Sequence, residues 1–437
     1  MSIRTPMSDL RLVWDWEPAA EVRSPELRAT WARLEIWAGD RCISLIEDAD
    51  TRSTRRSIFC SLYPVAEWIA YNWWLLRADS RPESRLAAAV TDSPQTPGAD
   101  SHNLRSAGDG FIWPDLSIVP IGSVTRLTWR SDEVGSVSQP VRYVSNGEAF
   151  VNSDQAMETL ARLVDAVVTR LTELDVADTP LASEWNEIVH TPTQVAEFCV
   201  SAARLGLDPY SDGALFRSQI LRASRELQGP AYTDLLDSIA PAHIEAALTW
   251  IGNARRLLRV SGPRSPEPRL RLLQEATRHF SAEGPPWNAG YVAADRVRAA
   301  LELSSGQRFP IDRFVRFVEN GQLSVEPGIH AAGRADKSAV VLNRRPAAPA
   351  RRFTLARALW HVLIEPESLF LVTAAHTDRQ RAERAFAAEL LAPAAGVADR
   401  LAARGASDVE DVDEVARSYG VSAMVIEHQI ENQLVEL

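Results

Sequence analysis

Two stretches near the C-terminal end, RFTLARALWHVL at residues 352–363 and RAFAAELLAP at residues 384–393, decide the fold of this chain. We expect each to lie on a helix, the first over 353–364 and the second over 379–391. A strand at 338–343 and a basic, proline-containing turn at 344–351 precede the first helix, and a short helix at 311–318 precedes the strand. The last quarter of the chain is therefore predicted to contain a strand, a turn and two helices in this order.

These stretches resemble the signatures of the ImmA/IrrE family of bacterial metallo-endopeptidases, which read RFTLAHExxH and FAAxLLxP. Residues 352–356 and 386–393 match these signatures closely. A bare motif match carries little weight, but here it sits in the expected context of strand, turn and signature helix. The resemblance implies a zincin-like core at 311–437.

In that family, two histidines one helical turn apart bind Zn²⁺, and the glutamate after the first activates a bound water. The matching positions here hold Arg357, Ala358 and His361, and the family's third ligand, a glutamate, falls on Gln380. A guanidinium has no lone pair for a metal, and alanine is no base. The resemblance thus implies a degenerate site with no catalytic residues, no metal and no cofactor. Trp360 replaces a family glycine, and we expect its ring to crowd the space over the helix.

A guanidinium buried without a partner is costly. If Arg357 fills the vacated metal position, it should therefore pair with a carboxylate nearby in sequence. Glu383 and Glu389, both on the following helix, are the candidates.

An alternative keeps zinc with rearranged ligands drawn from His361, His376, Glu383 and Glu389. Such a protein would be a zinc-dependent endopeptidase that acts on a regulatory protein. A catalytic zinc needs about three protein ligands and an activated water, and the sequence offers no evident general base.

Length and composition limit the number of domains, the class of partner and the cellular compartment. A chain of 437 residues is long enough for two or three domains, and its net charge of −11 disfavours a general nucleic-acid binder. Cys42, Cys60 and Cys199 are too widely spaced for a metal knuckle or a disulfide framework, which favours a reducing cytoplasm. Neither a signal peptide nor a membrane-spanning run is evident, so no membrane partner is expected.

Residues 8–150 have the pattern of an α+β domain. Alternating, β-branched and aromatic runs predict strands at 10–14, 30–37, 42–46, 118–121 and 124–129. The turn at 38–40 predicts a hairpin, and the apolar spacing over 63–76 predicts a helix packed on the sheet. Residues 91–101 should form a surface loop.

A polar loop follows, with His102, Arg105 and Asp109 beside two glycines. These side chains could converge on a small ligand, which would make the protein a ligand sensor. The alternative is a tight turn whose polar side chains bond to their own backbone.

Residues 151–306 have a helical pattern, opening with a long amphipathic helix that Ser153 and Asp154 are expected to cap. Further helices are predicted at 192–205, 214–227, 231–239, 242–257, 267–281 and 287–303. The three histidines of this region lack the zinc-helix spacing and are treated as ordinary residues.

The last segment, 412–432, predicts a helix, a turn at 419–422 and a second helix, similar to a helix-turn-helix. The second helix carries Glu427 and Glu431 and no arginine or lysine, so binding of its face to phosphates is disfavoured. We expect a packing or dimerisation role for it, and the oligomeric state stays open.

The sequence thus predicts a mostly helical α+β protein with an N-terminal α+β domain at 8–150, a helical region at 151–306 and a metallopeptidase-type domain at 311–437. The favoured function is that of a cytoplasmic bacterial pseudoenzyme, a regulatory protein that binds a protein partner. The resemblance implies a stress-response or mobile-element setting.

Overall fold

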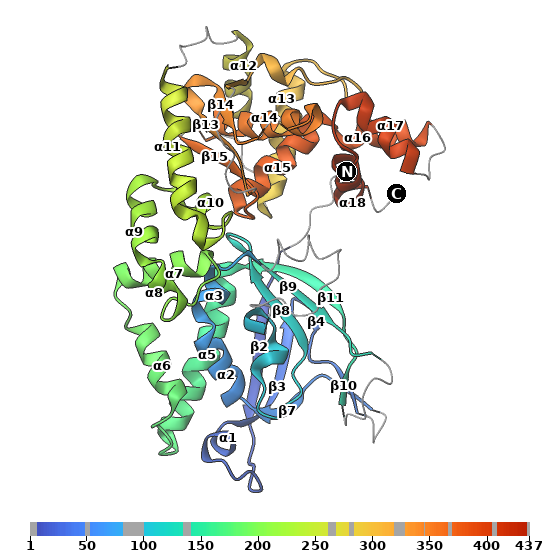
Figure 1. Ribbon diagram of the computed structural model, residues 1–437. Helices are drawn as coiled ribbons and strands as arrows, with labels where there is room; N and C mark the ends of the chain where they lie inside the picture. The colour runs from blue at the N-terminus through green and yellow to red at the C-terminus, as the bar shows by residue number, and fades with distance from the viewer. Residues whose placement is uncertain are drawn as a thin grey trace. The chain divides into compact units, whose positions relative to one another are not determined.

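The computed structural model describes residues 7–48, 53–81, 100–133, 141–260, 268–278, 284–318, 328–344, 346–365, 369–403 and 409–434. The chain divides into two units, Pro6–Arg217 and Ser218–Leu437 (Figure 1). Both contain helices and small sheets, and helices predominate, which confirms the predicted fold class. Most of the loop expected at 91–101 lies outside the described residues.

A central antiparallel sheet of the N-terminal unit is built on β3 (Trp31–Ala38), with β2 (Leu10–Trp16) on one side and β7 (Ile58–Ser61) on the other. β4 (Arg41–Cys42) returns along β3, which confirms the predicted hairpin. The turn between them needs a left-handed residue, and Gly39 takes it at φ 59°.

A second sheet has the order β1-β11-β9-β8 and a third the order β10-β5-β6. Their strands are β1 (Met7–Ser8), β11 (Gly147–Asn152), β9 (Val124–Arg130), β8 (Asp115–Pro120), β10 (Val141–Tyr143), β5 (Ile46–Asp48) and β6 (Thr54–Arg55). The single strand predicted at 42–46 is wrong. A turn divides it into β4 and β5, because the Ser44 hydroxyl accepts from the Ile36 N–H and donates to the Arg56 carbonyl.

The helix predicted at 63–76 is two helices, α2 (Tyr63–Tyr71) and α3 (Trp73–Ala78). They are separated at Asn72, whose side chain donates to the Trp68 carbonyl. The long helix α5 (Ser153–Glu173) packs against α2 and β2. Its cap is Asn152 rather than the predicted Ser153 and Asp154, because the Asn152 side chain accepts from the Gln155 N–H.

The remaining helices of this unit are short. They are α1 (Pro25–Ala29), α6 (Pro180–Val189), α7 (Thr193–Arg204) and α8 (Asp212–Leu215). Helix α6 was not predicted, although Thr179 caps it and Pro180 occupies its first turn.

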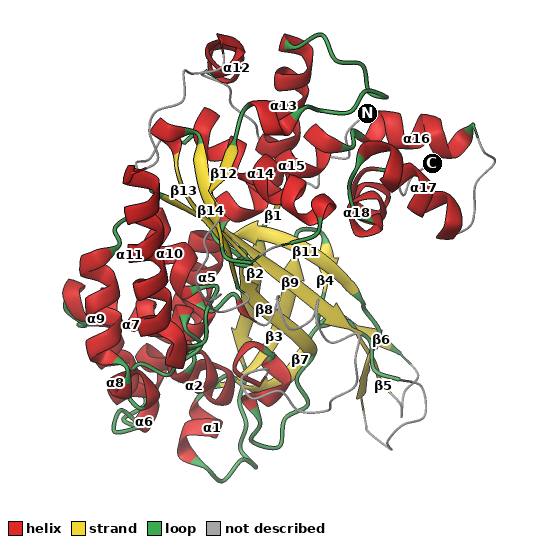
Figure 2. Ribbon diagram, turned by 45° about the horizontal axis from the view of Figure 1, so that its top comes forward, coloured by secondary structure: helices red, strands yellow, loops and turns green. Residues whose placement is uncertain are grey.

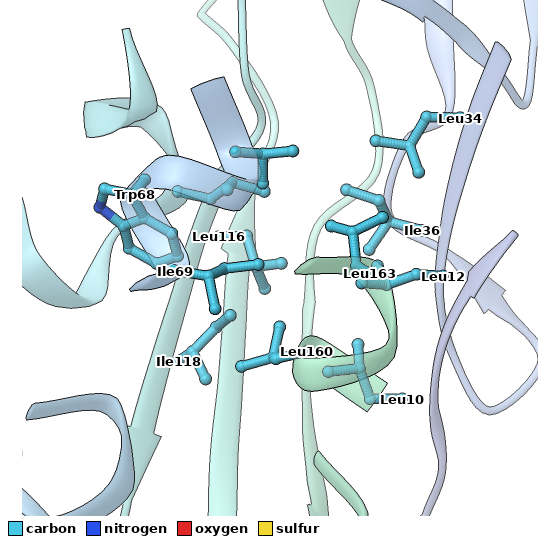
Figure 3. A pocket seen from close by; sticks show the side chains of 12 residues that line it. Leu10, Leu12, Leu34, Ile36, Trp68, Ile69, Leu116, Ile118, Leu160 and Leu163 are labelled. Atoms are coloured by element: carbon cyan, nitrogen blue, oxygen red, sulfur yellow. The ribbon is translucent and has the colours of Figure 1, made fainter. Parts of the chain in front are cut away.

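An apolar cavity of about 20 Å³ lies inside the N-terminal unit (Figure 3). It is lined by Leu10, Leu12, Leu34, Ile36, Val65, Trp68, Ile69, Leu104, Leu116, Ile118, Leu160 and Leu163, which come from both main sheets, from α2 and α5, and from the 3-10 turn Leu104–Ala107. Ligand sites usually measure at least about 300 Å³, so this void is a packing defect of the core.

The C-terminal unit holds a four-stranded sheet of order β12-β14-β13-β15 (Figure 2). Its strands are β12 (Arg316–Val318), β13 (Ile329–Arg334), β14 (Ala339–Leu342) and β15 (Phe370–Thr373). β13 is antiparallel to both neighbours, whereas β12 and β14 are parallel. The short helix predicted at 311–318 is wrong: a 3-10 turn at Ile311–Arg313 leads directly into β12.

Three long helices form the core of this unit with the sheet: α13 (Pro286–Ala300), α14 (Ala348–Leu363) and α15 (Asp378–Leu391). α13 and α15 pack closely because Gly290 has no side chain; a Cβ there would lie 2.2 Å from the Ala382 carbonyl oxygen. The other helices are α9 (Arg217–Glu226), α10 (Pro230–Leu236), α11 (Ile244–Val260) and α12 (Pro268–Thr277). α11 packs on β13 and β14, and α10 on β15.

The chain ends with α16 (Ala394–Ala402), α17 (Val409–Tyr419) and α18 (Ala423–Gln433). The helix, turn and helix expected at 412–432 are therefore present, although α16 was not foreseen. Buried Val425, Ile426 and Gln429 fix α18 against the unit.

The helices expected as one central region are shared between the two units. α5 to α8 belong to the N-terminal unit, and α10 to α13 to the C-terminal unit. Within the described residues, no helix combines the length and the apolar character that crossing a membrane requires.

Candidate functional site

Helices α14 and α15 bring the positions of the degenerate motif together in the C-terminal unit. Arg357 and His361 lie one turn apart on α14, and Gln380 and Glu383 lie one turn apart on α15. All four side chains are buried, with His361, Gln380 and Glu383 at 0% exposure. Glu383 is not a position of the motif; Ala358, the remaining motif position, is buried in the hydrophobic core.

Arg357 directs its guanidinium at the carboxylate of Glu383. Its Nε donates to Glu383 Oε1 at 2.7 Å, and its Nη2 lies 2.5 Å from the same oxygen. Nη2 also donates to the Thr373 carbonyl at 2.5 Å and to Gln380 Oε1 at 2.8 Å. The expected pairing of Arg357 with a carboxylate is confirmed for Glu383.

Glu389 has other partners. It accepts from the Ala394 N–H and from the side-chain amides of Gln429 and Gln433, at 2.7 and 2.8 Å for the two amides. Burial raises the pKa of Glu389 despite these donors. This carboxylate therefore joins α15 to α16 and α18 rather than serving the site.

Gln380 closes the free edge of β15. Its Oε1 accepts from the Thr373 N–H at 2.8 Å, and its Nε2 donates to the Leu371 carbonyl at 2.9 Å. The side-chain amide thus bonds to the strand as a peptide group of a neighbouring strand would. A glutamate, the family residue at this position, has no N–H and could not make the second bond.

His361 lies between two carboxylates. Its Nε2 bonds to Glu383 Oε2, and its Nδ1 lies 3.6 Å from Glu365 Oε2. The ring stacks on Phe370 with centroids 4.5 Å apart. Burial disfavours the charged imidazole, but the neighbouring carboxylates outweigh it and raise the pKa of His361. The protonated ring then donates to Glu383.

A second ion pair extends the network. Arg379 Nη2 lies 2.5 Å from Asp234 Oδ2, and its Nη1 lies 3.4 Å from Glu365 Oε2. Asp234, from α10, also accepts from Thr377 at 2.8 Å and from Gln380 Nε2 at 2.9 Å. Hydrogen bonds and ion-pair contacts together form a closed ring that runs through Arg357, Glu383, His361, Glu365, Arg379, Asp234 and Gln380; its link from His361 to Glu365 is an ion-pair contact at 3.6 Å.

Sequence reasoning missed three members of this ring. Arg379 and Glu365 flank the two signature stretches and could have been considered as charged neighbours. Asp234 lies more than a hundred residues earlier, and no local pattern marks it. Burial raises the pKa of Asp234, although Arg379 acts in the opposite direction.

The charges of the ring balance one another around Glu383. Burial opposes ionisation of this carboxyl, but the positive charges of Arg357 and His361 outweigh burial and lower its pKa. A buried carboxylate held by two cationic donors is satisfied, which is the condition for an ion pair to persist in a core.

These residues do not fit a zinc ion. Arg357 has no lone pair and brings a positive charge to the place of a dication. The two Glu383 oxygens and Oε1 of Gln380 are already engaged by buried donors. Removing those donors would be needed before either side chain could coordinate a metal.

The alternative zinc set is only partly brought together. His361 and Glu383 touch, whereas Glu389 bonds to Gln429 and Gln433. His376 lies beyond β15, where burial and the charges of nearby arginines lower its pKa to about 3. In the described part of the chain, no three histidine, cysteine, aspartate or glutamate side chains are placed to hold a metal ion.

The expectation for Trp360 is wrong. Its ring packs edge-on against Phe386 with centroids 5.6 Å apart and belongs to the hydrophobic core, at 3% exposure. It therefore fills the interior between α14 and α15 and does not stand in open space over the helix.

In the polar loop of the N-terminal unit, His102 and Arg105 bond to other residues of the same unit. His102 is buried, with Nδ1 bonded to the Ile118 carbonyl at 2.9 Å and Nε2 to Asp79 at 3.2 Å. Arg105 pairs with Asp132. Asp109 takes a left-handed turn conformation at φ 55°. The His102 and Arg105 side chains thus point to different partners.

Comparisons with known proteins support the predicted resemblance at the level of the domain. Residues 323–431 match the model of the IrrE N-terminal-like domain, the family Peptidase_M78. Neither the curated proteins nor the solved structures contain a match to this chain.

Proposed function

We propose, from the premise that residues 323–431 are an IrrE N-terminal-like domain of the peptidase M78 family, that this protein is a non-enzymatic descendant of such a peptidase. It acts as a regulatory protein that binds a protein partner, in a bacterial stress-response or mobile-element setting. The peptidase framework serves as a scaffold.

One observation carries the proposal: the Arg357 guanidinium is held by the Glu383 carboxylate, the Thr373 carbonyl and the Gln380 amide oxygen. Oxygen atoms surround a cation that is covalently part of the chain. A positive charge is thus built into the place where relatives recruit zinc, and no water is activated by a guanidinium.

The charge of the chain favours a protein partner over nucleic acid. The net charge is −11, and the exposed face of α18 carries Glu427 and Glu431. Phosphates would be repelled from such a face.

The test is a metal analysis of protein purified without added metal, together with unfolding in the presence and absence of a chelator. We expect far less than one zinc per chain and an unchanged unfolding midpoint. Stoichiometric zinc that is lost in His361→Ala, while His190→Ala retains it, would overturn the proposal. His190 is a suitable control because it is an exposed histidine outside the site.

A further inference from the structure

A cluster of basic side chains lies at one end of the C-terminal sheet. Because β13 is antiparallel to β14 and β15, its first residues lie beside the last residues of both neighbours. His330 is at the start of β13, Arg344 follows β14, and His376 follows β15. Arg357 and Arg384 reach the same place, since both donate to the Thr373 carbonyl at the end of β15.

Arg384 is the member whose charge is least compensated. Its Nη2 donates to the carbonyls of Thr373 at 3.0 Å and Ala375 at 2.6 Å. Its Nη1 is buried, and within the described residues it has no hydrogen-bond partner. Burial and the charge of Arg357 lower the pKa of Arg384 to about 9. An unpaired buried donor of this kind costs free energy that an incoming acceptor would recover.

Arg344 is exposed, and Glu383 reduces the positive charge of the cluster only in part. Glu383 is hydrogen bonded to Arg357 and His361; its charge raises the pKa of Arg384, but burial and the charge of Arg357 lower that pKa more. The three arginines outnumber Glu383, in a chain whose net charge is negative.

The pKa values of His330 and His376 are lowered by burial and by the positive charges around them. Burial of its ring, followed by the charges of Arg357 and Arg384, lowers the pKa of His330 to about 3 even though part of the side chain stays exposed. His376 is half-buried and is affected by burial and by Arg384 in the same direction. Both rings are neutral at pH 7 and can offer one N–H each to an anion.

We propose that this basic end of the sheet, formed by His330, Arg344, His376 and Arg384, binds the carboxylates of an acidic peptide segment. The inference rests on the proposed partner-binding function and names the chemistry of the partner. More than one carboxylate is needed to neutralise the cluster, which favours several acidic side chains over a single small anion. DNA is disfavoured because a duplex carries one negative charge per about 1.7 Å of its axis and needs a longer basic surface than these four side chains offer.

The test is fluorescence anisotropy of a labelled hexaglutamate peptide with the full chain at low salt. We expect binding that weakens as salt is raised, and that weakens at least about threefold in Arg344→Gln, as loss of one exposed charge contact predicts. Arg271→Gln, which removes an exposed charge from α12, is the matched control and should bind as the parent does. Because Arg384 holds two carbonyls, Arg384→Lys is used to keep the charge while removing the forked donor, and it should also weaken binding.

Further probes separate the sources of the anion. Hexalysine should not bind, and inorganic phosphate should compete only at much higher concentration than the peptide. A single-stranded oligonucleotide that binds as tightly as hexaglutamate and loses affinity in Arg344→Gln would overturn the peptide assignment, as would equal loss in Arg271→Gln. Zinc content is measured on the same samples, so failure of the acidic-peptide site is distinguishable from failure of the non-enzymatic assignment.

Discussion

One buried region in each unit can be compared. The N-terminal unit surrounds its small cavity with apolar side chains alone, whereas the C-terminal unit buries a ring of mostly charged side chains from α14, α15, α10 and Glu365. Both regions are buried, and Leu163 in the first is as inaccessible as Glu383 in the second.

The two buried regions should respond differently to amino-acid substitution. Apolar side chains can be exchanged for others of similar volume, because dispersion and burial are non-directional. A buried ion pair depends on both partners, because loss of one leaves a charge without compensation. The charged interior should therefore be the more sensitive of the two to a single substitution.

The largest effect is expected for Glu383→Ala. It leaves Arg357 and His361 buried without their shared carboxylate, and loss of one partner of a buried pair costs about 3–5 kcal/mol in the free energy of unfolding. Denaturant unfolding would measure it, with exposed Glu431→Ala as the control. A loss below about 1 kcal/mol would show that the ring contributes little.

A somewhat smaller loss is expected for Leu163→Ala in the apolar interior. This change enlarges an existing void, and buried Leu→Ala substitutions cost about 2–5 kcal/mol. Amide hydrogen exchange can assign the loss to its unit: protection should fall in β2, β3 and α5 and stay unchanged in α14 and α15. Equal loss of protection in both units would contradict an effect confined to the apolar interior. Val13→Ala, at an exposed position of β2, is the control.

The same contrast explains which features the sequence could reveal. Strands β2, β3, β8 and β9 and the hairpin at Gly39 follow from alternation and turn chemistry, which are local properties. The split of β4 from β5 depends on a single hydroxyl, Ser44, that bonds across the turn, and periodicity carries no such information.

For the site, the motif placed Arg357, His361 and Gln380 on two helices, and electrostatic reasoning named Glu383 as a partner. It could not find Asp234, because that partner arrives through the packing of α10 on β15. Nor could it place Trp360, whose direction depends on the facing residue Phe386. Local pattern thus identifies which residues matter, and tertiary packing decides what they contact.

The stability contributed by His361 and Glu383 is expected to depend moderately on pH. The His361 contribution is lost as pH rises, and the Glu383 contribution is lost as pH falls. The folded pKa of His361 is raised, so its contribution is complete below the unfolded value near 6.5 and is lost as pH rises through the folded value. The folded pKa of Glu383 is lowered, so its contribution is present above about 4.3 and is lost as pH falls.

The protection that His361 adds to α14 and α15 amides, measured as the difference between the parent and His361→Gln after correction for intrinsic exchange, should therefore be highest near pH 5–6 and decline on either side. The lowered pKa values of His330 and His376 act on stability in the opposite sense, but both residues are present in both chains and cancel in this difference. His361→Gln should remove the decline on the alkaline side. The apolar interior of the N-terminal unit offers an internal reference, since no titrating group lines its cavity. An alkaline decline that persists in His361→Gln would assign it to another group.

The smallest change is expected in activity, when the family residues are restored. Arg357→His, Ala358→Glu and Gln380→Glu rebuild the motif around His361, but they also dismantle the ring. A carboxylate at position 380 cannot donate to the Leu371 carbonyl and would face Asp234, which now accepts from the amide at 2.9 Å. We expect weak zinc binding and little cleavage of an unfolded substrate, because ligands must be held by their supporting contacts.

Adding Trp360→Gly to this triple variant should not rescue activity. The ring fills the core against Phe386, so its removal leaves a cavity and costs about 3–5 kcal/mol, as for other large aromatic truncations. Zinc affinity, hydrolysis and unfolding of the triple and quadruple variants measure these effects together. Robust cleavage by the triple variant would contradict this prediction. It would show that the scaffold can still hold a working metal site once the side chains of the ring are replaced.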